Sequence, residues 1–501
     1  MANDWVLLLP ELFVLLGALI LPFVGFYAKH RLVRPTVALT TLLLSMGAVA
    51  WMLWGRAFET IPEFADRQHT LFGLYEVTTF ALFFKFVFLL VPILVVLVSN
   101  DYLRQDREPT EYYALMLIAT FGMMVVASAR DLITLFVGLE TAAFSSYGLV
   151  AFRKTDAIVT ESATKFFIIG SLSSAIILYG ISLVYAVGGT VDLYELGGLL
   201  ANNPARPALL LAVAFLIAGL GFEISTVPFH MWAPDVYQGS PDTVSAFLAA
   251  GTKKMGFAAI IKIFIVGLIA FKLDWELLIG VLAVITMTVG NLAALNQTSM
   301  KRLLAWSSIA QAGYILIALP VGTSLALGGA LFHILTHAVM KGGAFVLIAV
   351  LAVRGVGDSI DEWRGIGRRY PLAGFTLAVI MLSLAGIPPL AGFVSKFILF
   401  ASAVDVGLAT DKTWLIGLAV AGVLNSALSL YYYARVIRAL YVEDTGKAPA
   451  AAGSATPFPQ GAVWVCFIVL FILLVLGVFP DGLVDISRTA ASSLLPATTL
   501  P

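Results

Sequence analysis

The sequence has a single cysteine among its 501 residues, Cys466, so no disulfide bond can form within the chain. One thiol also cannot hold an iron–sulfur cluster, which needs about four cysteine ligands. No GxGxxG loop follows a strand-like run, and no Walker motif occurs. The five histidines lack the partners that a zinc site requires. We therefore expect this chain to bind no nucleotide, no metal and no redox cofactor.

Charge is also scarce. Charged residues make up 12% of the chain, against about 25% in soluble domains. Hydrophobic residues make up 60%, and a surplus of this size must face lipid. The formal net charge is +0, which favours neither nucleic acid nor an acidic partner. The N-terminus lacks a basic region and its apolar run continues to Phe26, so we expect an uncleaved first helix.

Long apolar runs fill most of the sequence. Because a membrane helix needs about 20 apolar residues, they predict an all-α polytopic membrane protein with about 14 spans. The longest polar stretches between them are 56–76 and 443–460. Lys and Arg gather in alternate loops, most of all from Arg354 to Arg369, which predicts that both termini face outward. The expected spans are 5–27, 35–56, 77–99, 112–129, 131–152, 164–187, 207–229, 242–271, 276–295, 303–321, 325–353, 373–402, 412–441 and 461–480.

Two spans contain prolines at matching places. The seventh carries Glu223 and Pro228, and the twelfth carries Pro388 and Pro389 before Lys396. Proline removes a helix hydrogen bond, which membrane proteins tolerate where the backbone is buried or lines a wet cavity. Broken helices five spans apart indicate two inverted five-helix repeats, spans 4–8 and 9–13. The alternative is a pair of structural kinks.

This symmetry divides the chain into four units. We expect a three-helix N-terminal segment at 1–110, repeats at 111–272 and 273–442, and a linker with a C-terminal helix at 443–501.

Several charged residues interrupt the apolar helices, namely Glu140, Lys253, Lys341 and Lys396. A charge at membrane depth costs about 2.5–3.5 kcal/mol, so several of both signs indicate a buried hydrophilic path. Lysine suits proton transfer because burial can bring its pKa into the working range, whereas arginine keeps its proton. The alternative is a set of static buried ion pairs. Lys301 and Arg302 are interpreted as cytoplasmic anchors without chemistry.

A basic stripe marks the eleventh span. His333, His337 and Lys341 are spaced i, i+4 and i+8, so they share one helical face. A neutral imidazole both donates and accepts hydrogen bonds, and this stripe can relay protons between Lys253 and Lys396. The alternative is a set of satisfied polar groups in the core.

Five long stretches resemble the subunit N family of the proton-pumping NADH–quinone oxidoreductase, respiratory complex I, which belongs to the antiporter-like membrane subunits. The resemblance covers nearly the whole chain, in order. The stretches are FVGLETAAFSSYGLVAF (136–152), VPFHMWAPDVYQGSP (227–241), QTSMKRLLAWSSIAQAGYILIAL (297–319), LSLAGIPPLAGFVSKF (382–397) and LYYYARVIRALY (430–441).

The resemblance implies 14 helices with broken seventh and twelfth spans. It also implies proton-path roles for Glu140, Lys165, Lys253 and Lys396, which match the fifth-, sixth-, eighth- and twelfth-helix residues of the family. One position departs from the pattern, because Glu223 stands where the family usually has lysine. We expect a lysine beside this carboxylate to compensate it, with Lys253 preferred and Lys254 or Lys165 as alternatives.

The function implied is proton translocation in the bacterial inner membrane, coupled to quinone reduction elsewhere in the complex. NADH, FMN, iron–sulfur clusters and quinone would be bound by other subunits. The partners would be lipid and other membrane subunits, including neighbouring antiporter-like ones. Two alternatives are a subunit of a Mrp-type sodium/proton antiporter and a scaffold that does not translocate.

Overall fold

The computed structural model describes residues 4–28, 30–57, 70–71, 73–104, 106, 109–200, 206–442 and 458–495. Most of the two long polar stretches, 56–76 and 443–460, lies outside the described residues.

The described chain is almost entirely helical, apart from one small antiparallel hairpin of β1 (Thr70–Leu71) and β2 (Tyr75–Glu76). The first half of the chain contains α1 (Asp4–Leu7), α2 (Leu9–Tyr27), α3 (Val33–Ala57), α5 (Thr79–Tyr102), α6 (Pro109–Ser128), α7 (Leu132–Val150), η1 (Ala151–Arg153), α8 (Ala157–Gly188), α9 (Leu193–Leu199), α10 (Arg206–Glu223), α11 (Trp232–Gly239), α12 (Asp242–Phe247), η3 (Leu248–Thr252), α13 (Lys253–Lys262), η4 (Ile263–Gly267) and η5 (Ile269–Phe271). The second half contains α14 (Lys272–Leu295), α15 (Met300–Leu316), α16 (Ala318–Val321), α17 (Ser324–Ala352), η6 (Ile360–Trp363), α18 (Ile366–Arg369), α19 (Pro371–Ala385), α20 (Ala391–Ala409), α21 (Thr413–Tyr441), α22 (Gln460–Val478) and α23 (Asp481–Ser492).

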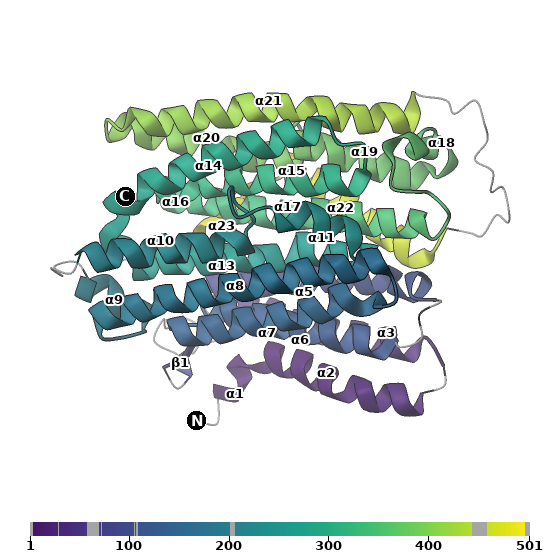
Figure 1. The fold of residues 1–501 in the computed structure, drawn as a ribbon, viewed down its shortest axis with the longest axis horizontal. Helices are drawn as coiled ribbons and strands as arrows, with labels where there is room; N and C mark the ends of the chain where they lie inside the picture. Colours follow the sequence, from purple (N-terminus) through teal and green to yellow (C-terminus); the bar gives the residue numbers. More distant parts are fainter. Residues whose placement is uncertain are drawn as a thin grey trace.

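The long helices lie side by side, and the two chain ends lie on the same side of the bundle (Figure 1). Among the described residues, 13 helices are long and apolar enough to cross a membrane. The eighth expected span is present as well, as an unbroken succession of α12, η3, α13 and η4, in which η3 and η4 are π-helical turns. An even number of crossings agrees with termini on one side. That this side is the outer one stays a prediction.

Both predicted helix breaks are present. In the seventh span α10 ends at Glu223 and α11 begins at Trp232, and in the twelfth α19 ends at Ala385 and α20 begins at Ala391. Side chains take up carbonyls left without a helical partner, because a buried carbonyl needs a hydrogen bond. The indole of Trp232 donates to Phe222 O at 3.0 Å.

The helix α17 runs through the middle of the bundle, and nearly all of its residues are buried. A helix that has no solvent-exposed polar face is stable where other helices surround it. Here α5, α12, α19, α20, α22 and α23 pack against it. The outer helices instead expose large apolar side chains, such as Phe23 on α2, Leu424 on α21 and Phe471 on α22, as expected of a surface that meets lipid.

Close helix crossings occur at equivalent places in the two expected repeats. A Cβ atom on Gly122 of α6 would lie 2.6 Å from Ala142 N of α7, and one on Gly290 of α14 would lie 2.5 Å from Ala310 N of α15. Small residues allow such approach of membrane helices. This correspondence accords with the two-repeat interpretation, whereas the four-unit division of the chain remains a prediction.

Replacing Gly290 by leucine is expected to separate α14 from α15 and to prevent assembly, because the added atoms meet backbone that cannot move aside. The amount of assembled membrane complex on a native gel measures the effect. Gly417→Leu is the matched control, since nothing lies within 4 Å of a Cβ at Gly417. Normal assembly of Gly290→Leu would contradict the close crossing.

Candidate proton-transfer site

Lys396 lies one turn after the break in the twelfth span, and its side chain points back to that break. Its Nζ donates to Leu384 O at 2.9 Å and to Ala385 O at 3.4 Å. It also lies 4.5 Å from the centre of the Tyr314 ring, a cation–π contact. The ammonium is therefore bound by carbonyls that the broken helix leaves free and by an aromatic face, with no carboxylate among these partners.

Lys341, from the middle of α17, is held by the first turns of α15. Its Nζ donates to Leu304 O at 2.8 Å and to Ser307 Oγ at 2.6 Å. The Ser307 hydroxyl lies 2.5 Å from the Tyr433 hydroxyl of α21. All of these side chains are buried. The roles of Ser307 and Tyr433 were not predicted from the sequence, because neither residue type stands out in an apolar helix.

The two histidines of α17 share one face, as expected, but contact different partners. His337 Nδ1 lies 2.8 Å from Lys254 Nζ. His333 lies 2.8 Å from Ser395 Oγ through Nδ1 and 3.0 Å from Gln311 Oε1 through Nε2. The rings stack 5.8 Å apart with 15° between their planes. The stripe therefore connects to neighbouring helices through side chains.

Lys253 and Lys254 begin α13 directly after the π-helical turn η3. Lys253 Nζ donates to Ser308 O at 2.9 Å, and Lys254 Nζ donates to Ala249 O at 3.0 Å in addition to its contact with His337. Both are buried. π-Helical turns are rare and occur frequently at functional sites. Here the turn precedes two lysines that reach across to α15 and α17.

Glu140 and Glu223 are partly buried in α7 and α10 and lie close enough to interact electrostatically. Among the described residues, neither carboxylate forms an ion pair with a lysine. The expected compensation of Glu223 by Lys253, Lys254 or Lys165 is therefore not observed. Lys253 and Lys254 point towards the second repeat, and Lys165 has other partners.

Lys165 lies on α8, and its half-exposed side chain belongs to a surface ion-pair cluster. Its Nζ lies 2.7 Å from Glu161 and 3.1 Å from Asp235. Asp235 also lies 2.8 Å from Arg302 of α15. The structure thus does not bring Lys165 together with the buried lysines of α13, α17 and α20.

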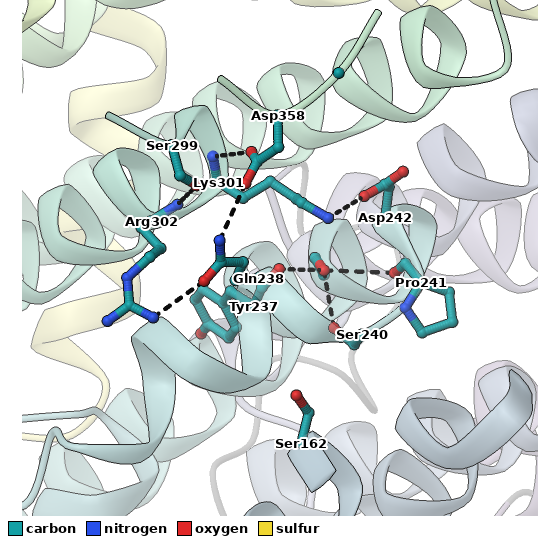
Figure 2. Close-up of polar contacts among 12 residues, drawn as sticks. Ser162, Tyr237, Gln238, Ser240, Pro241, Asp242, Ser299, Lys301, Arg302 and Asp358 are labelled. Atoms are coloured by element: carbon teal, nitrogen blue, oxygen red, sulfur yellow. Dashed lines mark hydrogen bonds and ion pairs between the residues drawn. The ribbon is translucent and has the colours of Figure 1, made fainter. Parts of the chain in front are cut away.

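A second polar cluster joins the two expected repeats (Figure 2). Lys301 of α15 lies 2.9 Å from Asp242, the first residue of α12. Asp358 accepts from Ser299 Oγ at 2.5 Å, from Lys301 N at 3.0 Å and from Gln238 Nε2 at 3.3 Å. Lys301 and Arg302, interpreted above as simple anchors, are therefore specific ion-pair partners of aspartates in the first repeat.

Replacing Lys301 by methionine is expected to destabilise the assembled protein by about 2 kcal/mol, because Asp242 loses its charged partner while staying largely buried. A thermal shift of the purified complex measures this effect. Lys154→Met removes an equivalent charge from an exposed position and serves as the control. Equal thermal stability of the two variants would mean that the Lys301–Asp242 ion pair does not stabilise the complex.

The opposite end of the eighth span has a further buried ion pair. Lys262 Nζ lies 2.9 Å from Glu76 and 2.5 Å from Ala129 O. The Tyr194 hydroxyl, on the short helix α9, donates to both oxygens of Glu76 at 2.9 and 3.1 Å. Burial, followed by the charge of Glu76, raises the pKa of Tyr194 well above its ordinary value. Tyr194 therefore stays protonated and keeps donating.

Within the part of the chain that the structure describes, no group of three His, Cys, Asp or Glu side chains is placed to hold a metal ion. The site consists of buried amines, imidazoles and hydroxyls that can exchange protons. A broken twelfth helix carrying a buried lysine, with a buried basic helix beside it, defines an antiporter-like membrane subunit.

Comparison with known proteins agrees with this class. The family model described as NADH:quinone oxidoreductase/Mrp antiporter, transmembrane region, matches residues 129–426, and the chain belongs to this family. It is 44% identical over 444 residues to F(420)H(2) dehydrogenase subunit N of Methanosarcina mazei, covering 86% of this chain and 87% of that protein. It is 40% identical over 438 residues to NADH-quinone oxidoreductase subunit N of Desulforamulus reducens, covering 87% and 89%.

Solved structures share the fold. A chain of respiratory complex I from Thermus thermophilus with bound aureothin has a TM-score of 0.76 and 31% identity, covering 95% of this chain and 98% of that one. A chain of the Mrp complex from Dietzia has a TM-score of 0.84 at 22% identity, covering 100% and 98%. The second likeness concerns the fold alone.

Proposed function

We propose that this chain is a proton-translocating, antiporter-like subunit of a respiratory NADH–quinone oxidoreductase in the bacterial cell membrane, where it couples quinone reduction in other subunits to proton transport. The observation that carries the proposal is the line of buried basic groups Lys254, His337, His333 and Lys396, in which Lys254 contacts His337 and the two imidazole rings stack. Lys341 connects to His333 through the polar side chains of Ser307, Tyr433 and Gln311. Each group is too costly to face lipid and each can exchange a proton.

Charge repulsion between neighbouring groups gives this line a mechanism. Lys254 and His337 are in contact, so a proton on one repels a second charge on the other. Each transfer then changes the proton affinity of the next group, and the line titrates as a coupled set. The carbonyl partners of Lys253, Lys341 and Lys396 stabilise an ammonium without neutralising it, which leaves every charge able to act on its neighbours.

In the first repeat, Glu140 and Glu223 take part as a pair of acids. A carboxylate can accept and release a proton, so the pair can exchange one as charge moves in the second repeat. The family resemblance implies a role for Lys165 as well, which here lies at the surface between Glu161 and Asp235.

The electron donor and the redox cofactors belong to other subunits. The two relatives named above are subunits of dehydrogenases with different donors, F(420)H(2) and NADH. A subunit without a redox centre can serve either complex. NADH, FMN, iron–sulfur clusters and quinone are accordingly assigned to partners of this chain, as are the neighbouring antiporter-like subunits.

The test is proton pumping by the assembled complex in sealed vesicles. Lys253→Met and Glu140→Gln are expected to lower the proton-to-electron ratio while the complex still assembles, with Lys154→Met as the surface control. An unchanged ratio in both variants would instead favour the scaffold function. Transport that requires sodium ions would favour the antiporter alternative.

A further inference from the structure

Gln311 lies in the middle of α15 as a fully buried amide whose polar atoms all have partners. Its Nε2 donates to Leu384 O at 3.1 Å and reaches Tyr433 OH at 3.5 Å. Its Oε1 lies 3.0 Å from His333 Nε2. The residue therefore stands between the break of the twelfth span and the histidine of α17.

The partners of Gln311 fix the orientation of its amide. A backbone carbonyl can only accept a hydrogen bond, so the NH₂ group must face Leu384 O and the amide oxygen must face His333. An amide oxygen also only accepts, so His333 Nε2 must carry a hydrogen. In the neutral ring the lone pair is then on Nδ1, which faces Ser395 Oγ at 2.8 Å.

His337 is not a hydrogen-bond partner of His333. The rings of His333 and His337 lie face to face, so their nitrogens do not point at one another. The Nδ1 atom of His337 is directed to Lys254 instead. Among the described residues, the hydrogen-bond partners of the His333 ring are Gln311 and Ser395.

We propose that Gln311 is a positioning residue that keeps the Nε2 hydrogen of His333 in place, so that His333 gains and loses the transferred proton only at Nδ1. The inference rests on the proposed function, for which it assigns the reacting atom.

Ser395 can satisfy both protonation states of Nδ1. In the neutral ring the Ser395 hydroxyl donates to Nδ1 at 2.8 Å. When a proton from the coupled amines of the proposed path forms an N–H bond at Nδ1, that bond donates to Ser395 Oγ, and the hydroxyl turns to donate to Gly392 O at 3.0 Å. Return of the proton to an amine breaks this N–H bond and reverses the turn. Gln311 and Lys396 donate to the same carbonyl, Leu384 O, at 3.1 and 2.9 Å. The residue that orients the imidazole is thus bound at the same carbonyl as the Lys396 ammonium.

Two substitutions in the assembled complex separate this role from simple packing. Gln311→Met fills the same space without an acceptor, and is expected to lower the coupled quinone-reduction rate about 10- to 100-fold, the loss that follows removal of the outer hydrogen-bond partner of a metal-binding histidine in other proteins. Gln311→Glu keeps an acceptor for Nε2 and is expected to retain most of the rate. Gln297→Met, just after the end of α14, is the matched control, because among the described residues the Gln297 side chain hydrogen-bonds only to Ala293 O.

A double substitution tests whether Gln311 acts through His333. If it does, Gln311→Met adds no further loss in a His333→Ala background, whereas independent effects would multiply. Equal losses in Gln311→Met and Gln311→Glu, or full multiplication in the double variant, would overturn the inference. An unchanged proton-to-electron ratio in His333→Ala would instead contradict the role of His333 in the proposed function.

Discussion

Arginine in place of Lys396 is expected to stop proton transfer through the second repeat even though the positive charge is kept. Lys396 is bound by Leu384 O, Ala385 O and the face of Tyr314, and an arginine can satisfy all three types of contact. What arginine cannot do is release its proton at physiological pH. We expect a loss of about 100-fold in the proton-transfer rate, at the lower end of what a positioned acid or base contributes.

This substitution distinguishes a carrier from a structural cation more sharply than alanine does. A static cation would be replaced well by arginine and poorly by alanine. The measurement is proton uptake into vesicles per electron delivered to quinone, with the amount of assembled complex determined in parallel. Lys412→Arg, in the ion pair with Glu276 at the start of α21, is the control. Normal pumping by Lys396→Arg would refute the carrier role.

Methionine in place of Lys254 is expected to interrupt transfer between the eighth span and α17. The Lys254–His337 contact of 2.8 Å is the hydrogen bond by which a lysine of the eighth span reaches the histidine stripe. Methionine fills a similar volume, so packing is kept while the proton donor is lost. The coupled rate should fall about tenfold or more, since a general acid or base is removed from the path.

The neighbouring lysine and a remote lysine provide comparisons for Lys254→Met. Lys272→Met removes a lysine that also donates to a backbone carbonyl, Val321 O, but at the end of a span and away from the line. The complex that carries Lys272→Met should pump protons normally. Proton pumping by Lys253→Met should also be impaired, because this substitution removes the separate hydrogen bond from Lys253 Nζ to Ser308 O. If Lys254→Met behaves like Lys272→Met, the contact with His337 has no role in transport.

The sequence predicts the spans, the two breaks and the buried basic residues because each has a local signal. About 20 apolar residues, a Pro-Pro pair and a lysine at membrane depth can each be recognised without knowing what lies beside them. It also predicted the shared face of His333, His337 and Lys341, which follows from the helical period alone.

The hydrogen-bond partners of these residues could not be predicted from the sequence. They depend on how each helix is rotated about its axis, and η3 changes that rotation just before Lys253 and Lys254. Because that rotation could not be foreseen, compensation of Glu223 by a lysine was predicted, and among the described residues no lysine forms an ion pair with it. Ser307, Gln311 and Tyr433 were missed because a hydroxyl or amide in a membrane helix is commonplace. Their role becomes visible only when α15, α17 and α21 are brought together.

The eighth span is fastened at both ends to the region of α5. At one end the backbone N–H of Asp242 donates to Tyr102 OH at 2.8 Å, and the Asp242 carboxylate binds Lys301. At the other end Lys262 is bound to Glu76, three residues before α5 begins. Between these two attachments lie the π-helical turn η3 and the paired lysines. Attachments at both ends oppose sliding of the span along its axis, so they hold Lys253 and Lys254 at one depth in the membrane.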